Sequence, residues 1–418
     1  MATSLSDATR RRSQRTFVSG QAVSFIGTEV TSFALPLIGV ITLDASASQM
    51  GWLTAASMMP HALSPFFAGP LVDASPKRMI MIVADLGRIV LLVAVPVVYA
   101  LGQLNVAVLA VIAFALGLLS VLFDTAFFAF VPQLAPSDQL LRLNGRLEAF
   151  RSGAQTIGPG SAGALVGALG APLTLLVNAV TFTVSAATVA IVRAEDPKPV
   201  RQGGGVKGYA RSVGAGFNEV WKRPVLRLLG LGSGAYNLFF AAASTVIAIL
   251  ILRNIGMSPF QYGIALAIGC VGGVLAGFAA DHLTGTWGIR TTFCVGLAVA
   301  SLCNVLIGLL PLTVILAFSL LVLAEFLGTF GATLYIVTNA SLRQVLVPVA
   351  LRGRVYATMR LLNRSAMPAG ALLGGWLATA TTVRTAVFIA GVSQVVTSLV
   401  FFGLRRLLPR SISAVEQP

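Results

Sequence analysis

Charged residues are scarce in this chain. Asp, Glu, Lys and Arg together make up 10% of its 418 residues, whereas 56% of the residues are hydrophobic. An ordinary soluble domain carries about 25% charged residues, and a water-facing surface for a chain of this length needs more polar groups than are present. The composition therefore excludes a typical soluble protein. It also excludes a disordered chain, because disordered chains are polar and rich in charge.

Cysteine and histidine are also rare, with three and two residues respectively. Cys270, Cys294 and Cys303 lie in apolar runs without metal-ligand spacing, so we interpret them as core residues. The two histidines are scattered, and the chain has no HExxH or GxSxG sequence that would indicate a membrane-embedded enzyme. We therefore expect no enzymatic activity, no cofactor and no metal. A receptor without transport is disfavoured because no large extramembrane domain is present.

Long apolar runs are what the chain has in abundance. A transmembrane helix needs roughly 20 mostly apolar residues, and we predict twelve of them. The predicted spans are 16–43, 50–72, 79–101, 105–131, 144–168, 171–193, 225–252, 259–281, 290–311, 313–339, 354–379 and 384–404. The first run is longer than the roughly 7–15 apolar residues of a signal peptide, so we expect it to be a true first helix.

The basic residues support this count. With the N-terminus in the cytoplasm, only Arg253 and Arg384 fall in outer loops, and four of the 29 Lys and Arg fall inside spans. The other 23 fall on cytoplasmic segments, as the positive-inside rule requires. The net charge of +15 therefore indicates membrane topology and not nucleic-acid binding. We predict a bacterial plasma-membrane (inner-membrane) protein with both termini cytoplasmic.

One long polar segment divides the chain. It predicts three parts: an N-terminal six-helix bundle over 1–193, a cytoplasmic linker over 194–224 and a C-terminal six-helix bundle over 225–418. Apolar residues recur at helical spacing between Val206 and Trp221. This pattern predicts either an amphipathic helix on the inner membrane surface or a solvated linker that packs against a bundle.

The two halves repeat each other, as is common in transporters. Three pairs of motifs recur about half a chain apart: Gly69 and Asp73 with Gly277 and Asp281, Arg151 and Pro159 with Arg360 and Pro368, and "SQMG" at 48–51 with "SPFQYG" at 258–263. We interpret the first pair as two loops, "GPLVDASPKR" after the second helix and "GFAADHLTG" after the eighth. These repeats predict two pseudo-symmetric six-helix bundles.

Twelve helices, a central cytoplasmic loop and duplicated GxxxD motifs resemble the major facilitator superfamily over nearly the whole chain. "DLGR", "VPQLAPSDQLLRLNG", "GPGSAG" and "LRGRVYATMR" resemble its macrolide-efflux and enterobactin-exporter branch. The superfamily's loop motif is matched by Gly69, Asp73, Lys77 and Arg78. Its antiporter motif is matched by Gly158, Pro159 and Gly163. The helix-four arginine of the family has no counterpart, because 105–131 contains no Arg.

Acidic residues inside the spans are candidates for transport chemistry, because a charge at the bilayer centre costs about 2.5–3.5 kcal/mol on insertion scales. Glu29 and Glu325 fall on helices one and ten, which the resemblance places around a central cavity. A carboxyl group withdrawn from water can exchange a proton near neutral pH or attract a cationic substrate. Asp124 on helix four is a third candidate. The alternative is a carboxyl group that hydrogen-bonds between helices as a structural element.

Other polar and small residues receive more specific predictions. Spacing of three residues predicts internal ion pairs between Asp85 and Arg88 and between Glu148 and Arg151. The resemblance implies a gating group formed by Asp73, Lys77, Arg78, Asp281, Arg354 and Arg360. It implies hinge or packing positions at Gly69, Gly158, Pro159, Gly163 and Pro368. Weaker candidates for substrate contact are Gln21, Gln155, Tyr236 and Asn237.

These features predict a secondary active transporter of the major facilitator fold. The expected activity is proton-coupled efflux of an amphipathic small molecule, such as a drug, an antibiotic or a siderophore-like compound, by alternating access. A uniporter, an uptake carrier or a lipid flippase of the same fold remains the alternative. The expected partners are a small-molecule substrate, protons and the lipid bilayer, with no nucleic acid, and the expected state is a monomer.

Overall fold

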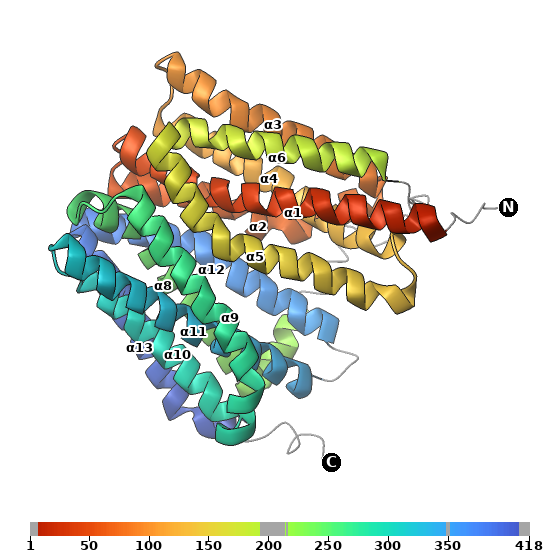
Figure 1. Cartoon of the computed structure of the whole chain (residues 1–418). Helices are drawn as coiled ribbons and strands as arrows, with labels where there is room; N and C mark the ends of the chain where they lie inside the picture. Colours follow the sequence, from red (N-terminus) through yellow and green to blue (C-terminus); the bar gives the residue numbers. More distant parts are fainter. Residues whose placement is uncertain (1–6, 193–213, 215, 348–351, 409–418) are drawn as a thin grey trace. The chain divides into compact units, whose positions relative to one another are not determined.

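The computed structural model describes residues 7–192, 214, 216–347 and 352–408, and these residues form helices joined by short turns (Figure 1). The long helices are α1 (Asp7–Leu37), α2 (Ala47–Asp73), α3 (Lys77–Ala100), α4 (Val106–Phe130), α5 (Ser137–Leu169), α6 (Ala171–Ile191), α8 (Pro224–Ile249), α9 (Pro259–Trp287), α10 (Ile289–Gly308), α11 (Val314–Leu346), α12 (Arg352–Ala380) and α13 (Val383–Gly403). Within these described ranges no strand occurs, so the prediction of an all-α protein is confirmed.

Among the described residues, nine helices are long and apolar enough to cross a membrane. The long helices outside that group are α2, α5 and α12. They contain prolines inside the helix, as at Pro60, Pro159 and Pro368, together with many small or basic residues. Small and polar residues lower the hydropathy of a helix although they suit close contact between helices. The number of twelve crossings therefore stays a prediction, whereas the multi-helix membrane fold is established.

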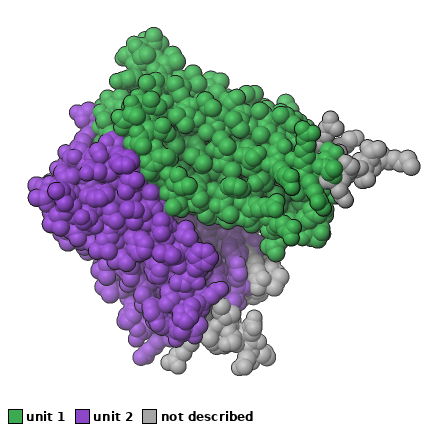
Figure 2. Space-filling view, in the orientation of Figure 1, with its two compact units in different colours: residues 1–43, 56–206 green, residues 44–55, 207–418 purple. Residues whose placement is uncertain are grey.

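The chain divides into two compact units (Figure 2). Unit 1 comprises residues 1–43 and 56–206, and unit 2 comprises residues 44–55 and 207–418. The start of α2 thus groups with unit 2, where Gly51 packs against Gly375 of α12 and Arg253 forms an ion pair with Asp44 at 2.9 Å. Most of the linker predicted at 194–224 lies outside the described residues.

The described end of that linker, residues 216–222, is helical. Val220 is buried in the core of unit 2 with Leu226 and Leu229. Phe217 and Trp221 stack with ring centroids 5.4 Å apart and are 45% and 49% exposed. This segment therefore packs Val220 into unit 2 and leaves an aromatic pair exposed.

The same helix pairings occur in both units. In unit 1, α1 packs on α5 and α6, and α3 packs on α4 and α6. In unit 2, α8 packs on α12 and α13, and α10 packs on α11 and α13. The six long helices of unit 2, α8 to α13, correspond in order to α1 to α6 of unit 1. Each of these pairings in unit 2 therefore matches a pairing of the corresponding helices in unit 1. The predicted pseudo-symmetry of two bundles is therefore present in the packing.

The ends of α1 and α8 show this repeat in detail. Each helix ends in a five-residue π-helical turn, η1 (Ile38–Thr42) after α1 and η3 (Leu250–Asn254) after α8. The N–H groups of Leu43 and Ile255 close these turns by donating to the carbonyl oxygens of Ile38 and Leu250, both at 3.0 Å. The two turns lie 212 residues apart, and this spacing recurs in the residues that follow.

The following helices, α2 and α9, both begin with a capping box. The Ser46 N–H donates to Gln49 Oε1 at 2.8 Å, and the Gln49 N–H donates to Ser46 Oγ at 3.3 Å. Ser258 and Gln261 make the same two bonds at 2.9 and 3.2 Å. These reciprocal bonds satisfy N–H groups that the first helical turn leaves unpaired. The repeat that the sequence suggested near 48–51 and 258–263 thus corresponds to two equivalent turns.

One sequence interpretation is wrong. The second GxxxD motif, at 277–285, was expected to be a loop, but it lies inside α9, which continues to Trp287. The connection to α10 is the single residue Gly288, whose φ of 79° is a conformation that glycine adopts without strain. The first motif is also helical over residues 69–73, at the end of α2, and residues 74–76 then form a short loop. Both GxxxD stretches are therefore helical, and they differ in where the helix ends: α2 ends at Asp73, whereas α9 continues past Asp281.

Close helix contact in unit 2 depends on glycines of α12. A Cβ atom at Gly374 would lie 2.1 Å from the backbone oxygen of Ala242 on α8, and one at Gly370 would lie 2.0 Å from the oxygen of Leu238. A side chain of any size would therefore push α8 and α12 apart. Lipid tails are as apolar as leucine, so this backbone approach, more than hydrophobic burial, holds the two helices together.

Replacing Gly374 with alanine tests this contact. We expect Gly374→Ala to destabilise the protein by about 1–3 kcal/mol, the usual cost of overpacking a tight contact. The measurement is thermal unfolding of the purified protein in detergent. Gly234→Ala on α8 is the matched control, because no atom lies within 4 Å of its added Cβ and alanine favours helix. Equal unfolding temperatures for the two variants would contradict the proposed role of Gly374.

Candidate functional site

Glu29 lies inside the candidate span Ala8–Thr42 and faces α5. A Cβ atom at Gly158 would lie only 2.4 Å from Glu29 Cβ, so α5 comes this close only because residue 158 is glycine. Arg151, two turns earlier on α5, interacts electrostatically with the Glu29 carboxylate. Its guanidinium lies 5.0 Å from the ring centre of Phe25, one turn before Glu29. This face of α1 therefore presents an aromatic ring and a carboxyl group to a cation and a glycine.

Glu325 has a similar setting in unit 2. It lies on α11, where a Cβ atom at Gly269 of α9 would come within 3.0 Å of Glu325 Cβ. Its charge also interacts with Tyr262 on α9 and Cys303 on α10. In contrast to Glu29, none of these neighbours is basic.

Both glutamates are partly buried, and neither forms an ion pair with any residue in the described ranges. In each unit a carboxyl group on one helix is thus seated against a glycine of the adjacent helix. The expectation that the two carboxyl groups share one water-accessible chamber stays a prediction.

Asp85 and Arg88 form an ion pair inside unit 1. Their exposed fractions are 0% and 4%, and Arg88 Nη2 donates to Asp85 Oδ1. The guanidinium lies between two rings, 4.3 Å from the centre of Phe123 on α4 and 4.0 Å from that of Phe182 on α6. Both contacts are within cation–π range. The three-residue spacing correctly predicted this pair.

A polar network extends from this pair. Gln21 Nε2 on α1 donates to Ser185 Oγ on α6 at 3.1 Å, and Ser185 interacts in turn with Asp85. Gln21 Oε1, Asp85 Oδ2 and Arg88 Nε are buried without a partner among the described residues. Buried polar atoms usually have partners, so these three atoms mark a polar region inside unit 1. Gln21 is buried in this region, and its contact with substrate stays a prediction.

Asp124 on α4 interacts electrostatically with Arg88. The cation that faces α4 therefore comes from α3. The sequence showed only that span 105–131 contains no arginine, and it did not show that Arg88 lies next to Asp124.

The predicted ion pair between Glu148 and Arg151 is absent from the described structure. Glu148 is exposed on α5, whereas Arg151 turns toward α1 and lies over the rings of Phe25 and Phe128. Residues at i and i+3 share one side of a helix, but a nearby aromatic face attracts the guanidinium elsewhere. Arg151 therefore belongs to the surroundings of Glu29.

The unit 1 residues of the predicted gating group lie at helix ends. Asp73 is exposed at the end of α2, and Lys77 Nζ donates to the Ser75 oxygen at 3.3 Å. Arg78 on α3 donates to the Ala190 oxygen near the end of α6. These bonds tie the start of α3 to the preceding loop and to the end of α6, so Lys77 and Arg78 have structural contacts of their own.

The unit 2 members of that group are less defined. Asp281 is exposed within α9, Arg360 is exposed on α12, and the side chain of Arg354 lies outside the described part of the structure. A gating role for these residues and for Asp73 stays a prediction.

The remaining predicted contacts differ in accessibility. Gln155 is exposed on α5. Tyr236 on α8 is buried with its ring centroid 5.2 Å from that of Tyr335, and Asn237 Nδ2 donates to the Ser233 oxygen at 3.0 Å. The buried position of Tyr236 favours a packing role.

Among the predicted hinge residues, Pro159 and Pro368 lie inside α5 and α12, and Gly163 is buried. An added Cβ at Gly69 would meet no atom within 4 Å, so packing does not require glycine there.

Sequence reasoning missed a hydrogen-bonded group between α8 and α11. The hydroxyl of Tyr335 and Nδ2 of Asn339 both donate to Ser233 Oγ, at 2.8 and 3.0 Å. Arg343 Nε donates to Asn339 Oδ1 at 2.8 Å. The three α11 residues follow one another at intervals of four, which places them on one helix face. That spacing was the available signal, and it is weak because only Arg343 is charged.

Comparison with known proteins identifies the family. The sequence profile of the Major Facilitator Superfamily matches residues 17–324 and 229–417. The chain belongs to the Major Facilitator Superfamily. Membership in this superfamily makes it a multi-pass membrane transporter and not an enzyme, and the sequence resemblance is confirmed.

Relatives within the superfamily cover nearly the full length. The multidrug efflux pump Tap of Mycobacterium tuberculosis (strain ATCC 25618 / H37Rv) is 26% identical over 91% of this chain and 90% of its own length. Tap of Mycolicibacterium fortuitum is also 26% identical, over 94% and 95%.

Solved structures of other transporters share the fold. A bacterial homologue of the iron transporter ferroportin, in an inward-facing state, has a TM-score of 0.77 at 16% identity and covers 94% of this chain and 98% of its own. The nucleoside transporter NupG has a TM-score of 0.74 at 11% identity, with coverage of 94% and 98%.

A double-mutant cycle tests the buried ion pair. We expect Arg88→Gln to cost about 3–5 kcal/mol of stability, because it leaves the Asp85 carboxylate buried without its cation. The double variant Asp85→Asn, Arg88→Gln should recover part of that loss, as measured by unfolding in detergent. The partly exposed pair Glu219 and Arg223, at 2.7 Å, is the control, with an expected cost below about 1 kcal/mol. Strictly additive effects at Asp85 and Arg88 would show that the pair is not coupled.

Proposed function

We propose that this transporter exports amphipathic small molecules in exchange for protons, by alternating access, across a bacterial plasma membrane. The relatives named multidrug efflux pump support efflux, since they match this chain over nine-tenths or more of both lengths. The cytoplasmic excess of Lys and Arg supports an orientation with both termini inside the cell.

The observation that carries the proton-coupled part is the setting of Glu29 and Glu325. Each is a partly buried carboxyl group inside a candidate span, without an ion pair among the described residues. A charge in such a place is costly and is retained where it has a task. A carboxyl group can avoid this free-energy cost by taking up a proton or by binding a cation. In an antiporter these two events must be mutually exclusive.

Competition between these two events supplies the mechanism. In the outward-facing state a proton from the medium neutralises the proton-exchanging carboxylate, and this change of charge favours release of a cationic or hydrogen-bonding substrate. In the inward-facing state the proton leaves to the cytoplasm, and the substrate-binding carboxylate takes up the next substrate. A ligand shifts a conformational equilibrium only by its differential affinity for the two states, so the coupling requires that the protonated and substrate-bound forms favour different states.

The neighbours of the two glutamates suggest a division of roles. Glu29 faces Arg151, so part of its charge is balanced by a cation of the protein. Glu325 has Tyr262 and Cys303 as electrostatic neighbours, and no basic neighbour among the residues that the structure describes. We therefore assign the primary proton exchange to Glu325 and assign to Glu29 the binding of substrate together with Arg151. Asp124 and Asp85 both interact with the positive charge of Arg88, and this interaction favours a structural role for Asp124.

Neutral glutamine variants test this proposal. We expect Glu325→Gln to reduce transport driven by a pH gradient by at least roughly tenfold, the order of effect of losing a positioned proton-transfer group. Substrate counterflow without a gradient should persist. Glu29→Gln should weaken counterflow as well. The measurements are drug accumulation in a host that lacks its own pumps and transport in proteoliposomes with an imposed gradient.

Glu148→Gln is the matched control, because Glu148 is an exposed glutamate on α5 and its variant should transport normally. Full gradient-driven transport by both Glu29→Gln and Glu325→Gln would rule out these carboxyl groups as the coupling site. Transport by the unaltered protein that ignores the gradient would instead indicate a uniporter.

A further inference from the structure

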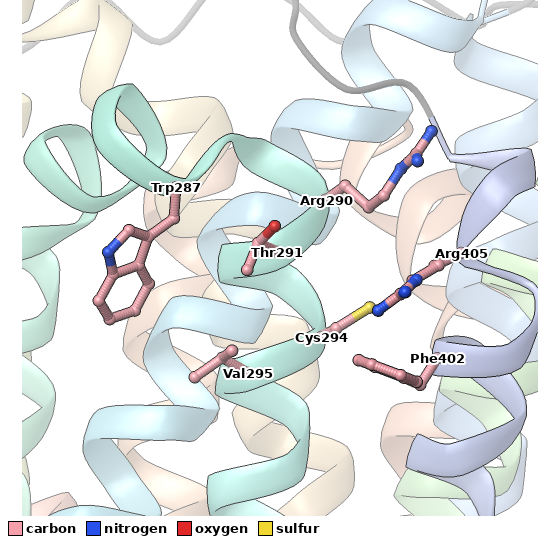
Figure 3. A pocket seen from close by; sticks show the side chains of 7 residues that line it. All are labelled: Trp287, Arg290, Thr291, Cys294, Val295, Phe402 and Arg405. Carbon is pink, nitrogen blue, oxygen red and sulfur yellow. The ribbon is translucent and has the colours of Figure 1, made fainter.

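A cavity of about 430 Å³ lies in unit 2 between the start of α10 and the end of α13 (Figure 3). Arg290 reaches from α10 toward the end of α13, and Arg405 reaches back from the short helix η5 (Arg405–Leu407) toward Cys294 on α10. None of the lining residues is acidic. The cavity therefore has two positive charges and no internal counter-charge.

Both guanidinium groups are held in place. Arg290 Nε donates to the Leu408 oxygen at 2.8 Å, and Nη2 donates to the same oxygen. This contact uses one edge of the guanidinium and leaves Nη1 for other bonds. The Arg405 guanidinium lies 4.0 Å from the ring centre of Phe402, which leaves its N–H edges free to donate. Fixed guanidinium groups suit phosphate, because their parallel N–H bonds match two phosphate oxygens.

The backbone adds to the positive potential. α10 begins directly after Gly288, and its first N–H to bond within the turn is that of Thr292, which donates to the Gly288 oxygen at 3.1 Å. The N–H of Thr291 precedes it and has no carbonyl partner within the helix. Thr291 lines the cavity with an exposed hydroxyl group. An anion there would meet backbone and hydroxyl donors together with the two arginines.

Three lining side chains are apolar, namely Val295, Trp287 and Phe402, and the two aromatic ones are 50% and 51% exposed. Phe402 lies beside Arg405, whereas Trp287 and Val295 lie apart from the arginines (Figure 3). Tryptophan is typical of the membrane–water interface. A ligand that fills this cavity would combine an anionic group with an apolar chain. An inorganic anion would satisfy the arginines but leave the apolar side chains uncovered.

We infer that this cavity binds the phosphate headgroup of an anionic phospholipid, with Arg290 and Arg405 on the phosphate and an acyl chain along Val295 and Phe402. The topology predicted from the basic residues places both arginines at the cytoplasmic face, where anionic lipids attract basic residues. Basic pockets between transmembrane helices on that face suit such headgroups. A bound lipid would join α10 to α13 and stabilise unit 2. The inference is independent of proton coupling and of the transported substrate.

Lipid binding to the purified full-length protein tests the site. Native mass spectrometry would count bound dioctanoyl-phosphatidylglycerol during a titration, with dioctanoyl-phosphatidylcholine and inorganic phosphate as comparison probes. We expect one phosphatidylglycerol to bind more tightly than phosphatidylcholine. Arg405→Gln should weaken that binding about tenfold, as expected for the loss of a charge-assisted contact. Arg405→Lys should retain part of it.

Arg406→Gln is the matched control, since Arg406 is the adjacent exposed arginine and does not line the cavity. It should bind phosphatidylglycerol like the unaltered protein. Equal losses in Arg405→Gln and Arg406→Gln would overturn the site in favour of general surface charge. Equal binding of the two lipids would overturn recognition of the anionic headgroup. Displacement of the lipid by inorganic phosphate at similar concentration would show that the cavity takes a free anion.

Discussion

The hydrocarbon interior of a bilayer offers no hydrogen-bond partners, and the structure follows from that constraint. Backbone groups are satisfied within helices, and hydroxyl side chains bond to their own helix, as Thr125 and Thr338 do to the oxygens of Val121 and Leu334 at 2.8 and 2.6 Å. Charges inside the spans are similarly restricted. Asp85 and Arg88 neutralise each other between two aromatic rings, whereas Glu29 and Glu325 have no such pairing and stand out as functional candidates.

The same constraint explains why glycines matter both for packing and for the candidate site. The hydrophobic effect contributes little to association of helices within lipid, so close packing of their backbones supplies most of the attraction. Gly296 and Gly331 bring α10 and α11 together in this way, as Gly374 does for α8 and α12. Gly158 and Gly269 use the same device beside the two glutamates. Because a side chain there would displace the glutamate, stability and the position of the carboxyl group depend on the same residues.

Much of the fold was predictable because the bilayer imposes long apolar runs and a charge asymmetry that the sequence displays directly. The site was predictable only in part. One three-residue spacing, Asp85 with Arg88, gave an ion pair, but the same spacing at Glu148 and Arg151 did not. Helical spacing shows which residues share a side of one helix, but it does not show which side chains the neighbouring helix contributes. Here α1 contributes the ring of Phe25, and Arg151 packs on it. The bonds to Ser233 were invisible for the same reason, since they join uncharged residues of distant segments.

The equivalent turns after α1 and α8 have a consequence for how the two halves can be compared. A π-helical turn, with hydrogen bonds from i to i+5, is rare. It occurs at Ile38–Thr42 and again at Leu250–Asn254, each time followed by a residue with positive φ, Asp44 or Gly256, and by a Ser–Gln capping box. The two connections are therefore equivalent residue by residue, and each position in one turn has an internal reference position in the other.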